Sequence, residues 1–394
     1  MAGRGWWRWW PQGAQPAVPV LLLLVIGVGV PVTAYLSHLL PLTTTWEPAA
    51  QAAEADSFIN EKVKTENEKV KTEVSPAPGR VVLLLMTGVN WEDLYEAATS
   101  GWLPRWHTYF DRGAWALLNV NTDLARRAED AYVTVGAGAP ARDKDFKVRG
   151  ADVAERVKTL YQRRLGFDPG EVKILHPHVV GLQRANAAAD HPVRVGALGE
   201  VLAQAGVPVA VLGNADLPGQ PNRGVVAVAM DAAGRVPYGR IDETVVLVDP
   251  QAPAGLRTDW EVIWAEFRAL PFDAGLVVIE AGDFLRLDAL RSEFTDARLR
   301  FYRRRAFQAM DQFLSRLLAQ LEPTRDLLIV ASIAPNSEGE ALQDALTPVF
   351  AFGRGIPAGL LVSATTRRPG LIANVDLAPT VLAHFDLAPA PEMI

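Results

Sequence analysis

The run Val81-Val82-Leu83-Leu84-Leu85-Met86 decides the fold class of this chain. It follows Pro78-Gly79 and ends at Thr87-Gly88, so turn-forming residues bound it on both sides. Its length is that of a strand. A continuous apolar run without polar alternation is typical of a strand that is covered on both faces. The run therefore predicts an inner strand of a sheet with helices on both sides.

Three further apolar runs have the same character, and helical patterns separate them. The runs are 207–212, 276–279 and 327–330, and the helical stretches are about 92–100, 151–165, 194–205, 258–269 and 296–321. This alternation predicts an α/β domain with a mostly parallel central sheet and helices on both faces. Sites in such folds gather at the carboxyl ends of the strands. Those ends are Thr87-Gly88, Gly213-Asn214, Glu280 to Asp283, and Ser332 to Asn336.

The composition bounds the class of protein. The chain has 394 residues, 49% hydrophobic and 21% charged, with a net charge of −6. A disordered chain is excluded, and a nucleic-acid partner bound by bulk electrostatics is not expected. There is no cysteine, which excludes disulfide scaffolds, zinc ribbons, iron–sulfur clusters and thiol catalysis.

The N-terminal region predicts a membrane segment over 18–40. This stretch is long and apolar enough to span a bilayer as a helix. Its hydrophobic centre includes Leu21, Leu22, Leu23 and Leu24, and the tryptophans before it are Trp6, Trp7, Trp9 and Trp10. Arg4 and Arg8 are the only basic residues before Lys62, so the positive-inside rule places residues 1–17 in the cytoplasm and the rest of the chain outside. A signal peptide cleaved after Ala34 is the alternative, but the apolar run continues through Leu40 and favours a retained signal anchor.

Residues 41–79 predict a charged stalk. Glu-Lys-Val-Lys-Thr-Glu occurs at 61–66 and again at 68–73, with one apolar residue in each seven-residue repeat. A coiled coil needs two, so a solvated spacer is the better interpretation. The folded domain is then expected over 80–394, anchored in the cell membrane by a single pass.

Four stretches of the folded part resemble the alkaline phosphatase superfamily of phosphatases, sulfatases and phosphoglycerate mutases. They are Met86–Trp91, Tyr132–Gly138, Leu327–Asn336 and Asn374–Leu382. The last is the most specific, because Asp376-Leu377-Ala378-Pro379-Thr380 is similar to the superfamily's closing D-x-A-P-T motif. Two further stretches, 213–216 and 366–370, look like a bacterial branch of this superfamily. The likeness covers nearly all of the folded part.

The resemblance implies two divalent metals, zinc, manganese or magnesium, that activate a Ser, Thr or Cys nucleophile. The implied ligand positions do not carry the ligands. Thr87 stands where the first-strand Asp is expected, and Ile333 and Ala334 stand in place of an Asp-His pair. A further Asp-His pair falls on Asp283 and Leu287. The nucleophile window, 124–132, has no Ser, Thr or Cys.

The sequence therefore predicts a degenerate metal site with no bound cofactor. The expected function is that of a non-catalytic, extracytoplasmic pseudoenzyme domain of the bacterial envelope, which binds an envelope protein or an anionic ligand. The alternative is an active phospho- or sulfo-ester hydrolase with a non-standard ligand set. Its candidates are Thr134 and Thr87 for catalysis and Asp283 and Asp288 for a divalent metal. A third interpretation is a purely structural spacer. An open cleft that brings together Thr87, Thr134, Asp283 and Ser332 would favour the hydrolase, and a cleft closed by apolar side chains would count against it.

Three smaller patterns have structural interpretations. His176-Pro177-His178 is expected in a surface loop, and Asp376 is expected to cap the helix that follows it. Five arginines begin the helix predicted over 296–321, and they are expected to form its solvated face. They are Arg298, Arg300, Arg303, Arg304 and Arg305.

Overall fold

The computed structural model describes residues 77–143, 150–342 and 346–394. Ser75–Ile394 form one compact unit. The predicted anchor over 18–40, its tryptophans and leucines, and nearly all of the predicted stalk lie outside the described residues. Within the described ranges, no helix has both the length and the hydropathy that a membrane crossing requires.

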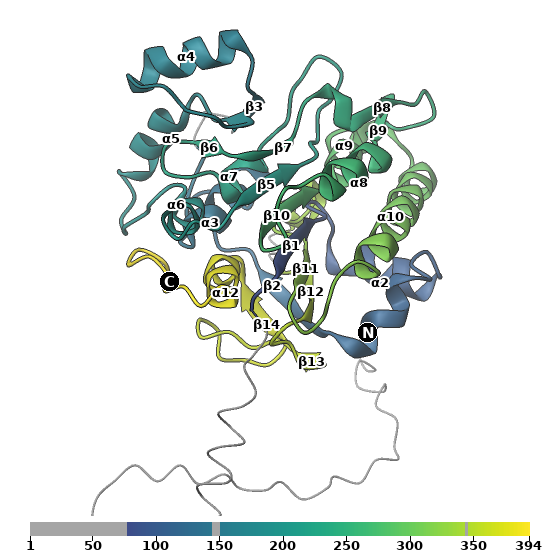
Figure 1. Ribbon diagram of the computed structural model, residues 1–394. Helices are drawn as coiled ribbons and strands as arrows, with labels where there is room; N and C mark the ends of the chain where they lie inside the picture. The colour runs from purple at the N-terminus through teal and green to yellow at the C-terminus, as the bar shows by residue number, and fades with distance from the viewer. Residues whose placement is uncertain (1–76, 144–149, 343–345) are drawn as a thin grey trace, which may run out of the picture. The chain divides into compact units, whose positions relative to one another are not determined.

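The predicted apolar runs form the middle of the main sheet (Figure 1). Arg80–Leu85 (β1) lies between Gly275–Glu280 (β10) and Leu327–Ala331 (β11) and is parallel to both. Val209–Leu212 (β5) pairs with β10, also in parallel. The other strands of this sheet are Ala114–Asn119 (β2), Tyr238–Arg240 (β7), Leu346–Gly353 (β12), Gly359–Leu360 (β13) and Leu371–Ala373 (β14). The order is β13-β2-β12-β11-β1-β10-β5-β7, with β14 on β2, and only β12 runs antiparallel to its neighbours. The prediction of a mostly parallel sheet is confirmed.

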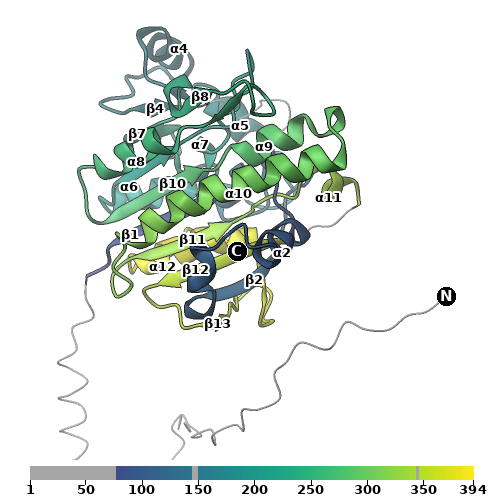
Figure 2. The same ribbon diagram turned by 90° about the vertical axis from the view of Figure 1, so that its right-hand side faces the viewer.

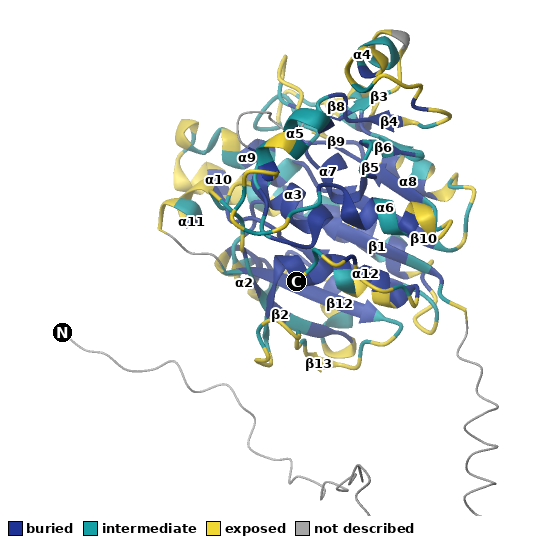
Figure 3. Cartoon of the chain, turned by 90° about the vertical axis from the view of Figure 1, so that its left-hand side faces the viewer, coloured by how far each residue is buried: buried dark blue, intermediate teal, exposed yellow. Residues whose placement is uncertain are grey.

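Helices cover both faces of this sheet, as predicted. In β1, Val81, Leu83 and Leu85 enter one hydrophobic core, and Val82 and Leu84 enter the other. The first core contains Ala128–Ala137 (α3), Val179–Asn186 (α5), Ala197–Gln204 (α6), Val226–Ala229 (α7) and Leu377–His384 (α12). The second contains Trp91–Thr99 (α2), Trp260–Arg268 (α8) and Asp296–Leu318 (α10). In Figure 2, α10 lies across the face of the sheet that carries the second core. Figure 3 shows the molecule from the opposite side, with the central strands buried.

Smaller elements complete the described part. They are the sheet of Ala151–Asp152 (β3), Ile174–Leu175 (β4) and Arg235–Val236 (β6), the hairpin of Val246–Val248 (β8) and Leu256–Thr258 (β9), the helices Glu155–Leu165 (α4), Asp283–Ala289 (α9) and Ser337–Ala341 (α11), and the 3-10 turns Trp106–Arg112, Glu243–Val245, Arg291–Glu293 and Asn374–Asp376. The predicted helix over 151–165 starts too early. Its first residues form β3, which pairs with β4, and the helix begins only at Glu155.

Candidate functional site

The carboxyl ends of β1, β10 and β11 meet at one edge of the sheet. Leu85 stands opposite both Glu280 and Ala331 in the register. Beyond the strands, the Gly88 amide donates to the Ala334 carbonyl at 3.0 Å, and the Ala281 amide donates to the Leu85 carbonyl at 2.8 Å. The parallel pairing of β1 with β10 and β11 therefore brings these three strand ends together.

This edge is closed by buried side chains. Thr87, Ser332, Ile333 and Ala334 are each 0% exposed. The Ser332 hydroxyl is used within the loop: it accepts from the Val89 amide at 3.2 Å and donates to the Ala334 carbonyl at 2.9 Å. Thr87, Ile333 and Ala334, three of the positions where the resemblance implies metal ligands, are therefore closed to water and substrate.

A buried hydrogen bond between Tyr132 and Glu280 lies at the same edge. The Tyr132 hydroxyl of α3 donates to Glu280 Oε2 at 2.6 Å. Burial raises the pKa of Glu280 from its ordinary 4.5 to about 8, although the Tyr132 hydrogen bond, Arg286 and the Thr87 hydroxyl act in the opposite direction. Burial and the Glu280 carboxyl raise the pKa of Tyr132 well above 10. Both groups therefore hold their protons at neutral pH, which avoids an unpaired charge in the core.

Thr87, a candidate catalytic residue of the alternative function, lies beside this pair. Its hydroxyl influences the pKa of both Glu280 and Tyr132, but Oγ1 makes no hydrogen bond of ordinary geometry to a described residue. At neutral pH the Thr87 hydroxyl therefore lies next to a carboxyl that holds its proton.

Thr134, the second candidate, serves a structural purpose in the last turns of α3. It is 0% exposed, and its Oγ1 accepts from the Ala141 amide at 2.9 Å. This hydrogen bond fixes the segment that follows α3. The helix ends at Gly138, whose φ of 64° lies in the left-handed region that favours glycine. Thr134 therefore faces the core rather than an open cleft.

Asp283, a candidate metal ligand, is held by an internal ion pair. Its Oδ1 accepts from Arg286 Nη1 at 2.9 Å and from the Thr258 amide at 2.8 Å. Arg286 is 0% exposed. This cation neutralises the carboxylate that a metal would need, and Leu287 beside it offers no ligand atom.

Asp288, the other candidate, contacts a different element. Its carboxylate accepts from the Ser337 amide at 3.0 Å and from the Ser337 hydroxyl at 2.9 Å, at the start of α11. The two aspartates are thus engaged on opposite sides of α9 rather than with a common centre. Across 77–143, 150–342 and 346–394, no three His, Asp or Glu side chains are arranged to hold a metal ion.

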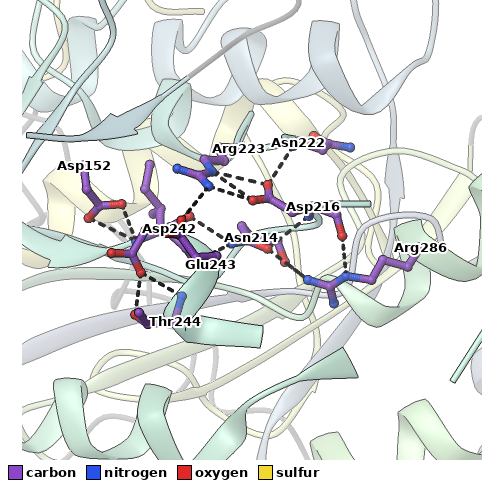
Figure 4. A network of polar contacts seen from close by, with 10 residues as sticks. Asp152, Asn214, Asp216, Asn222, Arg223, Asp242, Glu243, Thr244 and Arg286 are labelled. Atoms are coloured by element: carbon purple, nitrogen blue, oxygen red, sulfur yellow. Dashed lines mark hydrogen bonds and ion pairs between the residues drawn. The ribbon is translucent and has the colours of Figure 1, made fainter. Parts of the chain in front are cut away.

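Sequence reasoning missed the polar network that supports this edge (Figure 4). Arg286 Nη2 donates to the Asn214 carbonyl at 2.8 Å, and its Nε donates to the Asp216 carbonyl at 2.9 Å. The Asp216 carboxylate in turn binds Arg223 Nη2 at 2.8 Å. One signal was available, since Arg286 is three residues after Asp283 on a helix and such a spacing predicts a pair. The contacts of Arg286 with Asn214 and Asp216 could not be predicted from spacing, because only the fold brings the loop after β5 next to α9.

An acidic pair lies at the rim of this network, between β3 and the turn after β7. Asp152 accepts from the Ile241 amide at 3.3 Å. Burial and the neighbouring Asp242 raise its pKa to about 6, against the effect of that amide and of Arg223 and Arg240. The side chain therefore titrates just below neutral pH.

One of the smaller predictions is wrong, and another is confirmed only in part. His176 is not in a surface loop but is 0% exposed, and burial together with His178 lowers its pKa to about 3, so it is neutral. Asp376 stands at the N-cap position of α12, as predicted, but its side chain makes no capping hydrogen bond to that helix. Its Oδ2 accepts from the Ala373 amide at 2.7 Å, which stabilises the preceding turn.

The arginines at the start of α10 are only partly solvated. Arg298, Arg300 and Arg304 are exposed, as predicted. Arg303 instead donates to the buried Asp93 of α2 at 2.7 Å, and Arg300 pairs with Glu96 of the same helix. Arg298 donates to the Tyr302 hydroxyl at 2.6 Å. Most of these arginines are therefore solvated, and Arg300 and Arg303 also join α10 to α2.

No protein-family model and no curated protein matches this chain. Solved structures with a similar fold include a protein in the alkaline phosphatase superfamily from Vibrio parahaemolyticus, 10% identical, covering 81% of this chain and 69% of that one, with a TM-score of 0.46. Alkaline phosphatase from the Antarctic bacterium TAB5 is 11% identical and covers 79% of this chain and 99% of its own, with a TM-score of 0.44. The C-terminal periplasmic domain of the phosphoethanolamine transferase EptC from Campylobacter jejuni is 11% identical, covering 81% and 94%, with a TM-score of 0.42. These neighbours belong to the superfamily that the sequence motifs resemble, and no residue role is transferred from them.

Proposed function

We propose that the folded part is a non-catalytic domain of alkaline phosphatase-like fold, held at the outer face of a cell membrane by the N-terminal segment, where it binds a partner or an anionic ligand. One observation carries the non-catalytic role: the strand ends where such folds place their chemistry are filled by buried side chains. Thr87, Ile333 and Ala334 are each 0% exposed there. The membrane position rests on the sequence pattern alone.

The groups that remain at this edge support the same proposal. Glu280 is protonated and bound to Tyr132, and Asp283 is neutralised by Arg286. A two-metal mechanism needs several anionic or imidazole ligands around an open position. Opening this edge for metals would break the Glu280–Tyr132 and Asp283–Arg286 contacts and expose the apolar side chains beside them. The arrangement stabilises the fold instead.

Metal content tests the non-catalytic role. The full chain, purified in detergent, is dialysed against zinc, manganese and magnesium and then against buffer, and bound metal is measured by mass spectrometry. We expect metal at the level of a metal-free control protein and no hydrolysis of phosphate or sulfate esters. One or two ions held per chain, lost in a double variant Asp283→Asn and Asp288→Asn together with esterase activity, would establish the alternative hydrolase.

A further inference from the structure

A cavity outside the closed edge lies between the β8–β9 hairpin and the helices α9 and α10. Its volume is about 200 Å³. The apolar part of its wall comes from Leu256, Leu287, Ala306 and Ala309. Drug-sized ligands occupy larger sites, of about 300 to 1,000 Å³, so this cavity has room only for a smaller organic molecule.

Two arginines at the rim are held side by side by one carboxylate. Asp249 Oδ2 lies 3.1 Å from Arg257 Nε and 3.3 Å from Arg305 Nη2. Arg305 also donates to the Gln251 carbonyl at 3.2 Å. A guanidinium has five N–H donors, so both arginines retain unused donors. Asp249 therefore orients two cations whose remaining N–H groups are available to a ligand.

The other charged residues of the wall balance each other. Arg286 and Asp283 form the internal ion pair described above, and Arg286 has no exposed surface. The three guanidinium groups and two carboxylates that line the cavity thus leave an excess of one positive charge. Partly desolvated guanidinium groups bind carboxylate and phosphate through charge-assisted hydrogen bonds.

We propose that this cavity binds a small organic anion: a carboxylate or phosphate group that contacts Arg257 and Arg305, on a short apolar body that contacts Leu256 and Ala309. The anion adds the charge that the wall lacks, and the apolar body fills the inner volume. The inference deepens the proposed function, since it names the class of ligand that a non-catalytic domain would hold.

Binding of hexanoate and of phenylphosphonate to the full chain in detergent tests this site. Neither probe carries an ester bond, so its binding is measured independently of any hydrolysis, and a failure here is distinct from a failure of the non-catalytic role. Saturation-transfer NMR and calorimetry should detect at least one of the two anions. Hexanamide, which has the same apolar body without the charge, should bind at least tenfold more weakly, as expected for the loss of a charge-assisted contact.

Three variants locate the binding. Arg257→Gln and Arg305→Gln should each weaken the anion about tenfold, and Ala309→Leu should remove binding by filling the cavity while it keeps both charges. Arg316→Gln is the matched control, because Arg316 lies on the same helix, pairs with Glu261 and is 38% exposed, as is Arg305. The proposal is overturned if neither anion binds, if hexanamide binds as well as hexanoate, or if the Arg257 and Arg305 variants behave like the control.

Discussion

The pair of Glu280 and Tyr132 makes the stability of this fold depend on pH. With a pKa of about 8, folded Glu280 keeps a proton that the unfolded chain releases near its ordinary 4.5. The free energy of unfolding therefore falls as the pH rises through this window. In Glu280→Gln, an amide that is neutral at every pH still accepts from Tyr132. In urea melts, we expect the unfolding free energy of the variant to match that of the wild type near pH 4 and to exceed it by an amount that grows up to about pH 8. If the unfolding free energies of the wild type and the variant change in parallel with pH, this role of Glu280 is contradicted.

The two ends of this contact differ in how far sequence could find them. Glu280 stood out as a charge at the end of a buried strand. Its partner did not, because 148 residues separate the two and only the packing of α3 on the sheet joins them. Asp283 and Arg286 are three residues apart on one helix, so their pairing was within reach of spacing rules. A single sequence therefore does not reveal polar partners that lie far apart along the chain.

A mostly buried ion pair between Asp93 and Arg303 joins the helices α2 and α10. Arg303 Nη1 lies 2.7 Å from Asp93, and the two side chains are 17% and 10% exposed. Burial raises the pKa of Asp93, while Arg303 lowers it. Arg303→Gln should therefore cost about 2 to 3 kcal/mol of unfolding free energy, because it leaves a carboxylate buried without its cation. Arg304→Gln, on the exposed neighbour, should change stability by no more than about 0.5 kcal/mol. Equal losses in chemical denaturation would refute this role of Arg303.

The elements that sequence predicted well are those with long, uniform patterns. The buried strands β1, β5, β10 and β11 could be predicted because both of their faces are covered, which makes each whole run apolar. β7, β13 and β14 have three residues or fewer, too short for any pattern to show. The start of α4 was misplaced because Asp152 and its neighbour pair with β4, a tertiary contact that overrides the local helical pattern.

At the scale of the whole molecule, the sequence predicts both a fold and a membrane anchor, whereas the structure describes the folded unit and not residues 1–76. The motifs resemble those of the alkaline phosphatase superfamily, and the described residues form an α/β unit with a mostly parallel central sheet. The degenerate metal site was inferred from residue types at three strand ends, and the structure shows that Thr87, Ile333 and Ala334 at two of these ends are buried. The cavity beside α10 had no signature in the sequence, since its wall is built from the hairpin 246–258 and two helices that follow it.

We propose that the apolar stretch 18–40, with Arg4 and Arg8 before it, anchors the chain in a membrane. These charges should keep the N-terminus in the cytoplasm and place the stalk and the folded unit outside. In spheroplasts of a bacterial host, added protease should therefore cut within 41–79 and release a fragment close to Ser75–Ile394, while a variant without residues 1–40 stays protected inside. Arg4→Glu combined with Arg8→Glu should reduce the released fraction, because the orienting charge is lost. A mature chain that begins after Ala34 and leaves with the soluble fraction before protease is added would show that the segment is a cleaved signal and not an anchor.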